Sequence, residues 1–240
     1  MRKIAVSVSV AALVLSASCG SRHPSEVTVN PEFEPAEVGT ILLAPTVSTI
    51  TDGEDPRRES ERIPDRILWD RLSGRYDYRF LSPEQFKAAV YKAGLGPRLE
   101  EVMAGWADRH VIDVDFLRAV KSELDIDMIM IPVVYLWYKD EADYREAATA
   151  SATQVGMTLS LLDPLSGEVM WEASDENYLE AVRTEGERIQ STTGGIDRRI
   201  SGTTVTGRDM YAAPPFEDVT VLVVGSLVGA VPEKTAQTVR

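Results

Sequence analysis

The residues best placed for acid–base or metal chemistry lie around His110. Asp108, Asp113 and Asp115 flank it in the sequence, and a histidine with acids nearby can act as a general base or help to hold a metal. Asp113, however, is expected to cap the helix that follows it. No matching second histidine or cysteine completes a ligand set. We therefore interpret this cluster as a solvated connector and assign no catalytic or metal-binding residue to it.

Other signatures of enzymes are missing from the sequence. It contains no G-x-S-x-G, no G-x-G-x-x-G, no P-loop and no H-E-x-x-H. Asp52, Glu54 and Asp55 could bind Ca²⁺ weakly, but their spacing is not that of an EF-hand, and a solvated loop is the simpler interpretation. Carboxylates are abundant, so a carboxylate-based peptidoglycan hydrolase remains the less favoured enzymatic alternative. We expect a protein without enzymatic activity and without a cofactor.

Two groups of residues have the chemistry of partner contacts. Residues 183–213 are polar and glycine-rich, and five arginines in this segment face four acids, whereas the whole chain is strongly acidic. A non-periodic segment of this length tends to be functional or disordered, so its arginines are candidate contacts, with an inert surface insertion as the alternative. An aromatic strand end is the second candidate, with packing on its neighbours as the alternative. The candidate contact residues are Arg188, Arg198, Arg199, Arg208, Tyr135 and Trp137.

The single cysteine, Cys19, lies at the boundary of an export signal. Arg2 and Lys3 form a basic start, residues 4–15 are apolar, and residues 16–18 are small. An apolar run of this length is too short to cross a bilayer, which needs about 20 residues. Basic start, apolar run and small residues are typical of a signal peptide, which we assign to residues 1–18 with cleavage between Ser18 and Cys19.

The segment before Cys19 resembles the lipobox of bacterial lipoproteins. The commonest box has leucine three residues before the cysteine, whereas this chain has Ser16 there and Leu15 one residue earlier. An ordinary signal peptide cut at this boundary is the alternative. The resemblance implies that Cys19 carries acyl chains, palmitate among them, which hold the protein on a membrane. Gly20 and Ser21 follow the cysteine in place of the aspartate that tends to retain lipoproteins in the inner membrane, which implies the periplasmic side of the outer membrane.

Composition excludes several classes of protein. Among 240 residues, 25 are Lys or Arg and 38 are Asp or Glu, which gives a formal charge of −13. Such a balance repels a phosphate backbone, so nucleic acid is not an expected partner. One cysteine also excludes a disulfide framework. Residues 19–37 contain three prolines and few large apolar residues, which predicts a flexible tether after the lipidated cysteine, and residues 233–240 are expected to be a disordered tail.

The remaining chain, residues 38–232, predicts one α/β domain. An apolar run at 40–45 and alternation at 76–81 predict strands, and helical spacing of apolar residues predicts helices between and after them. Crossover helices should make the first strands parallel, and a hairpin should add antiparallel ones, so we expect a single sandwich domain with a mixed sheet and a C-terminal helix. Further strands are expected at 128–137, 154–162 and 169–174, and helices at 64–73, 83–93, 97–106, 113–124 and 216–231, the last with a strand as alternative.

Three segments resemble one superfamily of periplasmic lipoproteins. They are ILLAP at 41–45, LDIDMIMIPVV at 124–134 and SLLDPLSGEVMWEAS at 160–174. The superfamily includes the curli-assembly lipoprotein, activators of penicillin-binding proteins, and the amino-terminal domain of the propeller protein of the Tol–Pal system. Its hairpin turn, D-x-x-[ST]-G-E followed by an aromatic, is matched by Asp163, Ser166, Gly167, Glu168 and Trp171.

The sequence thus favours a non-enzymatic, lipid-anchored periplasmic protein. We expect it to act as an accessory or scaffold that binds another cell-envelope protein. An oligomeric component of a secretion or surface-assembly apparatus is the alternative. Long membrane-spanning hairpins would need alternating strands of about ten residues, and residues 139–153 and 183–213 do not alternate in this way.

Overall fold

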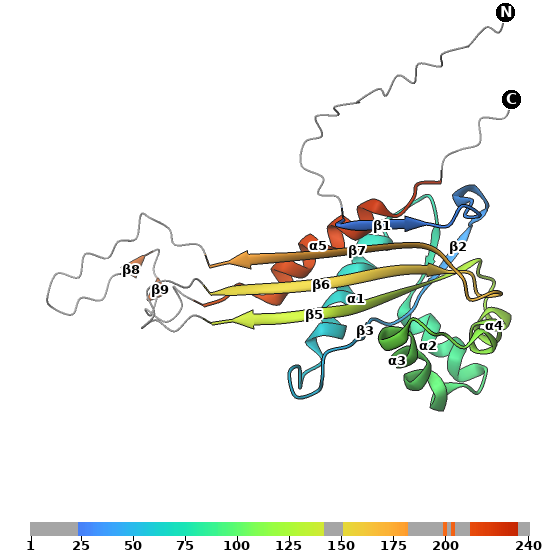
Figure 1. Ribbon diagram of the computed structural model, residues 1–240, viewed down its shortest axis with the longest axis horizontal. Helices are drawn as coiled ribbons and strands as arrows, with labels where there is room; N and C mark the ends of the chain where they lie inside the picture. The colour runs from blue at the N-terminus through green and yellow to red at the C-terminus, as the bar shows by residue number, and fades with distance from the viewer. Residues whose placement is uncertain (1–23, 142–150, 182–198, 201–202, 205–211, 235–240) are drawn as a thin grey trace, which may run out of the picture.

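The computed structural model describes residues 24–141, 151–181, 199–200, 203–204 and 212–234. Most strands join one mixed sheet, and helices lie on both of its faces (Figure 1). The strands are β1 (Glu26–Val29), β2 (Thr40–Leu43), β3 (Val47–Ser48), β4 (Arg79–Leu81), β5 (Met128–Asp140), β6 (Ala152–Leu162), β7 (Val169–Glu180), β8 (Arg199–Ile200) and β9 (Thr203–Thr204). The helices are α1 (Glu59–Leu72), α2 (Pro83–Lys92), α3 (Leu99–Arg109), α4 (Val114–Glu123) and α5 (Phe216–Ala230), with 3₁₀ turns η1 (Pro35–Glu37) and η2 (Gly96–Arg98).

The order of strands in the main sheet is β1-β7-β6-β5-β2-β4, and β3 pairs with β5 further along that strand. β2 is parallel to β4 and β5, because helices form the connections between these strands. β5, β6, β7 and β1 pair antiparallel in turn. The predicted fold class is confirmed: the protein is an α/β sandwich with a mixed sheet and a C-terminal helix. β8 and β9 pair only with each other.

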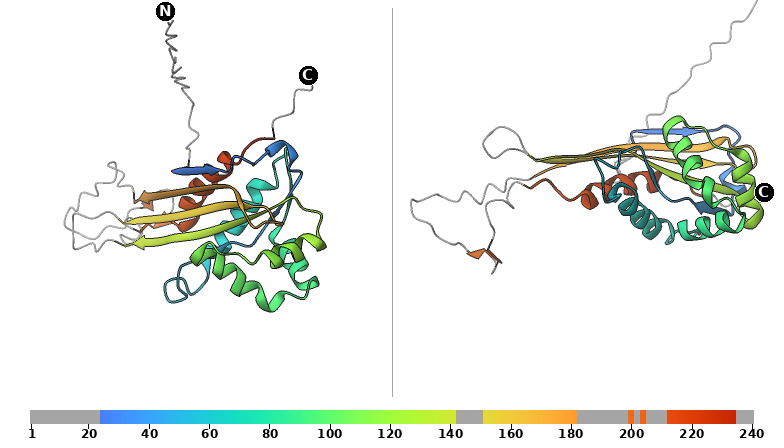
Figure 2. Two further views of the ribbon diagram at one scale, coloured as in Figure 1. Left: turned by 45° about the vertical axis from the view of Figure 1, so that its right-hand side comes forward. Right: turned by 90° about the horizontal axis from the view of Figure 1, so that it is seen from below.

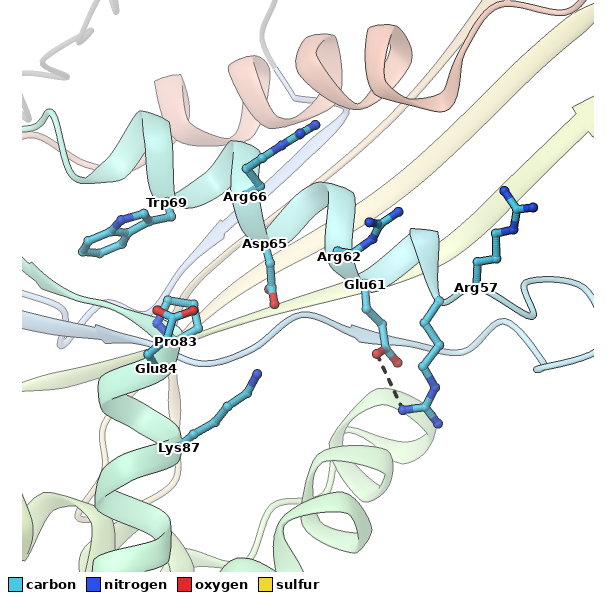
Figure 3. A pocket seen from close by; sticks show the side chains of 10 residues that line it. Arg57, Glu61, Arg62, Asp65, Arg66, Trp69, Pro83, Glu84 and Lys87 are labelled. Carbon is cyan, nitrogen blue, oxygen red and sulfur yellow. Dashed lines mark ion pairs between the residues drawn. The ribbon is translucent and has the colours of Figure 1, made fainter.

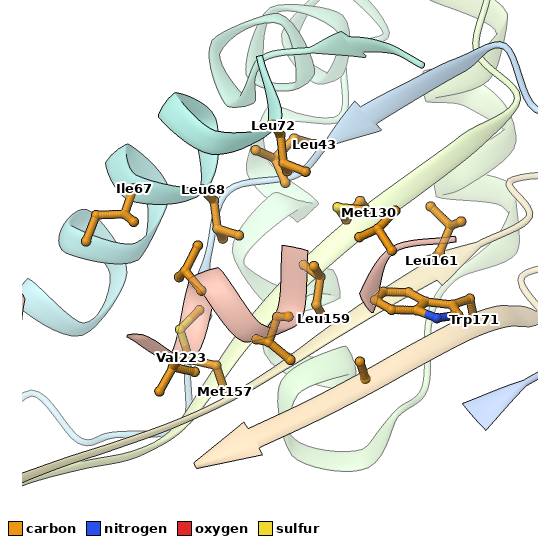
Figure 4. Close-up of a cluster of buried hydrophobic side chains, with 14 of the residues drawn as sticks. Leu43, Ile67, Leu68, Leu72, Met130, Met157, Leu159, Leu161, Trp171 and Val223 are labelled. Carbon is orange, nitrogen blue, oxygen red and sulfur yellow. The ribbon is translucent and has the colours of Figure 1, made fainter. Parts of the chain in front are cut away.

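One face of the sheet is covered by α1 and α5. Alternate β6 residues such as Met157, Leu159 and Leu161 pack beneath α5, with Trp171 of β7 beside them (Figure 4). Period-2 alternation directs these side chains to one face. α5 is a helix despite its many β-branched residues, because Val219, Val223 and Leu227 recur at helical spacing and are fully buried.

The opposite face is covered only in part. α2, α3 and α4 pack over β2, β4 and the first half of β5, where they bury Phe86, Trp106 and Phe116. On this face, no helix of the described chain lies over the outer half of β5, β6 and β7, which extends beyond the layer of α2, α3 and α4 (Figure 2). The structure therefore has one complete face and one half-open face.

The start of α2 and the turn between β6 and β7 form as predicted, because residues nearby in the sequence determine both. Ser82 and Gln85 form the predicted capping box at the start of α2. In the hairpin turn between β6 and β7, the carboxylate of Asp163 accepts the N–H groups of Leu165 and Ser166 at 3.0 and 3.3 Å. Gly167 in this turn has φ +77°, a conformation that side chains rarely adopt.

The prediction of a flexible tether over residues 19–37 is wrong for its described part. β1 pairs antiparallel with β7, and Ser25 Oγ donates a hydrogen bond of 2.9 Å to Asp175 Oδ1. Phe33 is 7% exposed in the core. The prolines suggested an extended chain, but an extended segment is also what a sheet edge can bind, and pairing with β7 decides the outcome.

Two further elements begin elsewhere than expected. α1 begins at Glu59, so Pro64 lies inside the helix rather than at its first turn. The helix begins earlier because both carboxylate oxygens of Asp55 accept backbone N–H groups, from Glu59 at 3.0 Å and Ser60 at 2.7 Å. The strand expected at 76–81 is only β4, because its partner β2 begins at Thr40, which pairs with Arg79.

Candidate functional site

The half-open face of the sheet carries a row of side chains across its three longest strands. Tyr138 of β5 pairs with Gln154 of β6, and Gln154 pairs with Tyr178 of β7. Tyr138 is 55% exposed and Tyr178 is 59% exposed. Alternation places this row on the face away from α5, because the next residues along, Trp137 and Val155, pack in the core beneath that helix.

Tyr135 lies on the same face of the sheet because it continues the alternation of Ile131 and Val133, and a β-bulge follows between Val134 and Leu136. Its ring lies against Gly156, where an added Cβ would come within 2.6 Å of a ring carbon. The hydroxyl donates a long hydrogen bond of 3.4 Å to the carbonyl of Asp175. Burial raises the pKa of Tyr135, and the nearby carboxylates of Glu176 and Asp175 raise it further. Tyr135 therefore remains a neutral hydrogen-bond donor, and 40% of its surface is exposed.

Polar side chains beside the tyrosines hold one another in place. Gln154 Nε2 donates to Glu176 Oε1. The hydroxyls of Thr158 and Ser174 lie 2.9 Å apart in a hydrogen bond. Hydrogen bonds across strands restrict the side chains before any partner arrives, which lowers the entropy lost on binding. We call the surface formed by Tyr135, Tyr138, Gln154 and Tyr178 the tyrosine face.

Trp137 does not belong to this surface and packs on its neighbours, which was the alternative interpretation of the aromatic strand end. It is 8% exposed and stacks on Phe216 of α5, with ring centroids 4.1 Å apart and planes 10° apart. Simple alternation would put Tyr135 and Trp137 on one face. The bulge inserts one residue between them and sends Trp137 to the core face.

The tyrosine face lies at the end of the sheet where β5 and β7 end. Tyr138 and Tyr178 are each two residues from the end of their strand. The N–H of Ala181 bonds to the carbonyl of Ser151 at 2.8 Å, and Thr153 Oγ1 donates to the carbonyl of Pro214. Ala181 and Pro214 therefore both lie at this end of the sheet, next to the aromatic row.

The remaining predicted site residues are not placed by the described chain. Cys19 and Ser18 lie outside the described residues, as do Arg188, Arg198 and Arg208. Arg199 begins β8, of which only the backbone is described. Their roles in lipidation, cleavage and partner contact stay predictions.

Tyr178 and Gln154 were missed by the sequence analysis. The acidic residues after Ser174 interrupt the apolar alternation, so the pattern predicts a second hairpin arm that ends at Ser174. A signal was nevertheless present, because Gln154 and Tyr178 are equally distant in sequence from Ser166 in the turn. Residues at equal distance from a hairpin turn pair across the strands.

The two acidic clusters considered from the sequence have structural roles. His110 ends α3 in a left-handed conformation, and its ring packs 5.2 Å from that of Trp106. Asp113 caps α4 as predicted and forms an ion pair with Arg98. Asp55 caps α1, as described above. Among the described residues, no group of three or more His, Cys, Asp or Glu could hold a metal ion.

The chain matches no protein-family model and no curated protein sequence. Among solved structures it is similar to lipoprotein GNA1162 from Neisseria meningitidis, with 15% identity and TM-score 0.38 over 62% of this chain and 88% of that one. It is also similar to a PelC dodecamer from Paraburkholderia phytofirmans, with 12% identity and TM-score 0.41 over 85% and 96%. The C-terminal domain of LpoB from Salmonella enterica aligns with 11% identity and TM-score 0.32 over 58% and 82%.

A lipoprotein is thus among the structures that the chain resembles, as the sequence resemblance predicted. At TM-scores this low the likeness carries no conclusion about function. Within the described residues, none of the helices combines the length and the apolar character needed to span a membrane.

Proposed function

We propose that this protein is a non-enzymatic accessory lipoprotein of the cell envelope that binds another envelope protein through the tyrosine face. The observation that carries the proposal is a row of half-exposed tyrosines on a sheet face that no described helix covers. Tyrosine is enriched at protein interfaces, because its ring supplies apolar area and its hydroxyl a hydrogen bond at low entropic cost. Tyr135 and Gln154 are also held by hydrogen bonds before binding, which lowers the entropy lost when a partner binds.

The anchor in this proposal is Cys19, acylated and facing the periplasm from the outer membrane. Supporting it are the basic start, the apolar run of residues 4–15 and the small residues before the cysteine. Several acyl chains, at roughly 0.8 kcal/mol for each buried CH₂, hold a protein on a bilayer without a basic patch. A chain with a formal charge of −13 gains little from anionic lipid surfaces, so the acyl chains are the attachment that it needs.

Site-specific photo-cross-linking in cells tests the binding surface. A benzophenone amino acid is placed at Tyr138 or Tyr178, and in a matched control at Tyr91, which is 69% exposed on α2 far from the tyrosine face. We expect one discrete cross-linked partner from the first two positions and none from the control.

The pattern of cross-linked products shows whether the tyrosine face binds a partner protein. The same products from Tyr91 as from Tyr178, or none from Tyr138 and Tyr178, would remove the tyrosine face as the binding site. A ladder of multiples of this chain would instead indicate the oligomeric assembly considered from the sequence.

A further inference from the structure

A groove lies between α1 and the start of α2, away from the tyrosine face. Its volume is about 500 Å³. Its basic side chains come from the two residues before α1 and from α1 itself, and Lys87 approaches from α2 on the other side (Figure 3). Five cationic side chains line it against three carboxylates, in a chain whose overall charge is −13. We call it the basic groove, and its cationic residues are Arg57, Arg58, Arg62, Arg66 and Lys87.

Four of these five cations lie within 4.0 Å of a carboxylate of the protein, Arg58 of three, but among the described residues only Arg66 is hydrogen-bonded to its carboxylate. Arg57 and Arg62 come no closer to a carboxylate than 4.0 and 3.9 Å, and Arg58 no closer than 3.7 Å. Among the described residues, none of these three guanidinium groups donates a hydrogen bond, and Lys87 has no ion-pair partner. Arg66 differs, because it donates to Glu217 at 2.7 Å. A guanidinium offers five donors in a planar fork that matches carboxylates, so the basic groove presents unused capacity for an anion.

Three carboxylates also line the groove, and they determine which kind of anion can bind; we call them the wall of the groove. Asp65 points from α1 toward the start of α2, and its Oδ1 accepts the N–H of Thr46 at 2.6 Å. Glu61 and Glu84 add two more carboxylates. Carboxylates accept hydrogen bonds and repel groups that offer none, so a chain of phosphates is disfavoured there. An acidic peptide can pair with both kinds of group, because its backbone N–H groups can donate to the carboxylates while its acidic side chains bind the arginines.

We propose that the basic groove binds an acidic peptide segment of a protein partner. Its glutamate or aspartate side chains pair with Arg58, Arg62 and Lys87, and its backbone donates to the carboxylates of the wall. Trp69 lies at one end of the groove, where it offers an apolar contact (Figure 3). Because the rest of the protein is acidic, such a segment is repelled elsewhere and directed to this site. The interaction does not depend on the tyrosine face.

The test is a titration of the full chain, purified in detergent, with fluorescent hexaglutamate followed by anisotropy. We expect saturable binding at low ionic strength that weakens as salt is added. The double variant Arg62→Gln with Lys87→Gln should bind at least tenfold more weakly. The matched control is Arg71→Gln with Arg79→Gln, which removes the same charge from exposed positions outside the groove and should stay within twofold of the parent chain.

Three results would overturn the proposal. The parent chain would fail to bind hexaglutamate, or both double variants would weaken alike, which would indicate diffuse attraction. Alternatively, a short polyphosphate of equal charge would compete as well as unlabelled hexaglutamate, which would contradict the role assigned to Asp65 and its neighbours. All four substituted side chains are exposed, and equal melting temperatures confirm that the variants fold.

Discussion

Replacing Trp171 tests the main core and an unusual feature within it. The side chain is 1% exposed and lies across from Leu161 of β6 and Val29 of β1. Burying roughly 200 Å² at about 25 cal/mol per Å² contributes about 5 kcal/mol. The indole Nε1 has no hydrogen-bond partner in the described structure, however, and a buried unsatisfied donor costs about 1–3 kcal/mol.

Two substitutions separate these opposing effects. Trp171→Ala should lower the free energy of unfolding by about 3–5 kcal/mol, since lost burial and a cavity outweigh removal of the unpaired donor. Trp171→Phe keeps most of the ring and removes the donor, so it should cost less than about 1.5 kcal/mol. Urea unfolding followed by far-ultraviolet circular dichroism measures both, because it does not depend on the fluorescence of the substituted residue.

The comparison between the two variants can refute the reasoning. An alanine variant within about 1 kcal/mol of the parent would show that Trp171 is not a core residue. A phenylalanine variant as unstable as the alanine variant would show that the indole N–H is satisfied, by a buried water for example. The slope of the unfolding free energy with urea should be unchanged, since a different slope would mean an altered unfolded or native ensemble.

Three further predictions concern the cap, the turn and the anchor. Asp55→Ala should lower the free energy of unfolding by about 1–2 kcal/mol at pH 7 through loss of the α1 cap. Burial raises the pKa of Asp55, but the N–H donors of Ser60 and Glu59 outweigh burial and lower it. The cap therefore contributes at neutral pH, and the difference from the parent should shrink below about pH 4 in a pH series of urea midpoints. Gly167→Ala should destabilise the protein by about 1–3 kcal/mol in thermal unfolding, because φ is +77° and the new Cβ would come within 2.8 Å of Val114 Cγ2. The control Gly225→Ala has open space around the new Cβ and should be neutral or stabilising by up to about 1 kcal/mol in the same measurement. Cys19→Ala should leave the protein in the soluble fraction, and sedimentation with outer membranes after a high-salt wash would contradict the lipid anchor.

Features with local causes could be predicted from the sequence. The capping residues Ser82 and Asp113 predict the start of their helices, and Asp163 with Gly167 predicts the hairpin turn, because each acts on backbone groups within a few residues. Helical spacing outweighed β-branched composition in α5 for the same reason, since one buried stripe decides its packing.

Features with tertiary causes could not be predicted in this way. β1 exists because β7 offers an edge, and a bulge in β5 decides that Trp137 is buried although Tyr135 is exposed. The basic groove is intermediate between these cases. Arg62 and Arg66 lie four residues apart and so share one side of α1, but only the tertiary arrangement of α1 and the start of α2 brings Lys87 opposite them.

The pairing of β1 changes how the domain samples the space near its anchor. With a tether that ended at Val38, the chain from Cys19 could extend about 65 Å at roughly 3.4 Å per residue. β1 begins at Glu26, which limits the reach to about 25 Å. The accessible volume scales with the cube of the reach, so it falls about 20-fold, and the effective concentration of the domain toward a membrane-held partner rises by the same factor. If Cys19 carries the acyl chains, a contact that is weak in solution becomes well populated at the membrane surface.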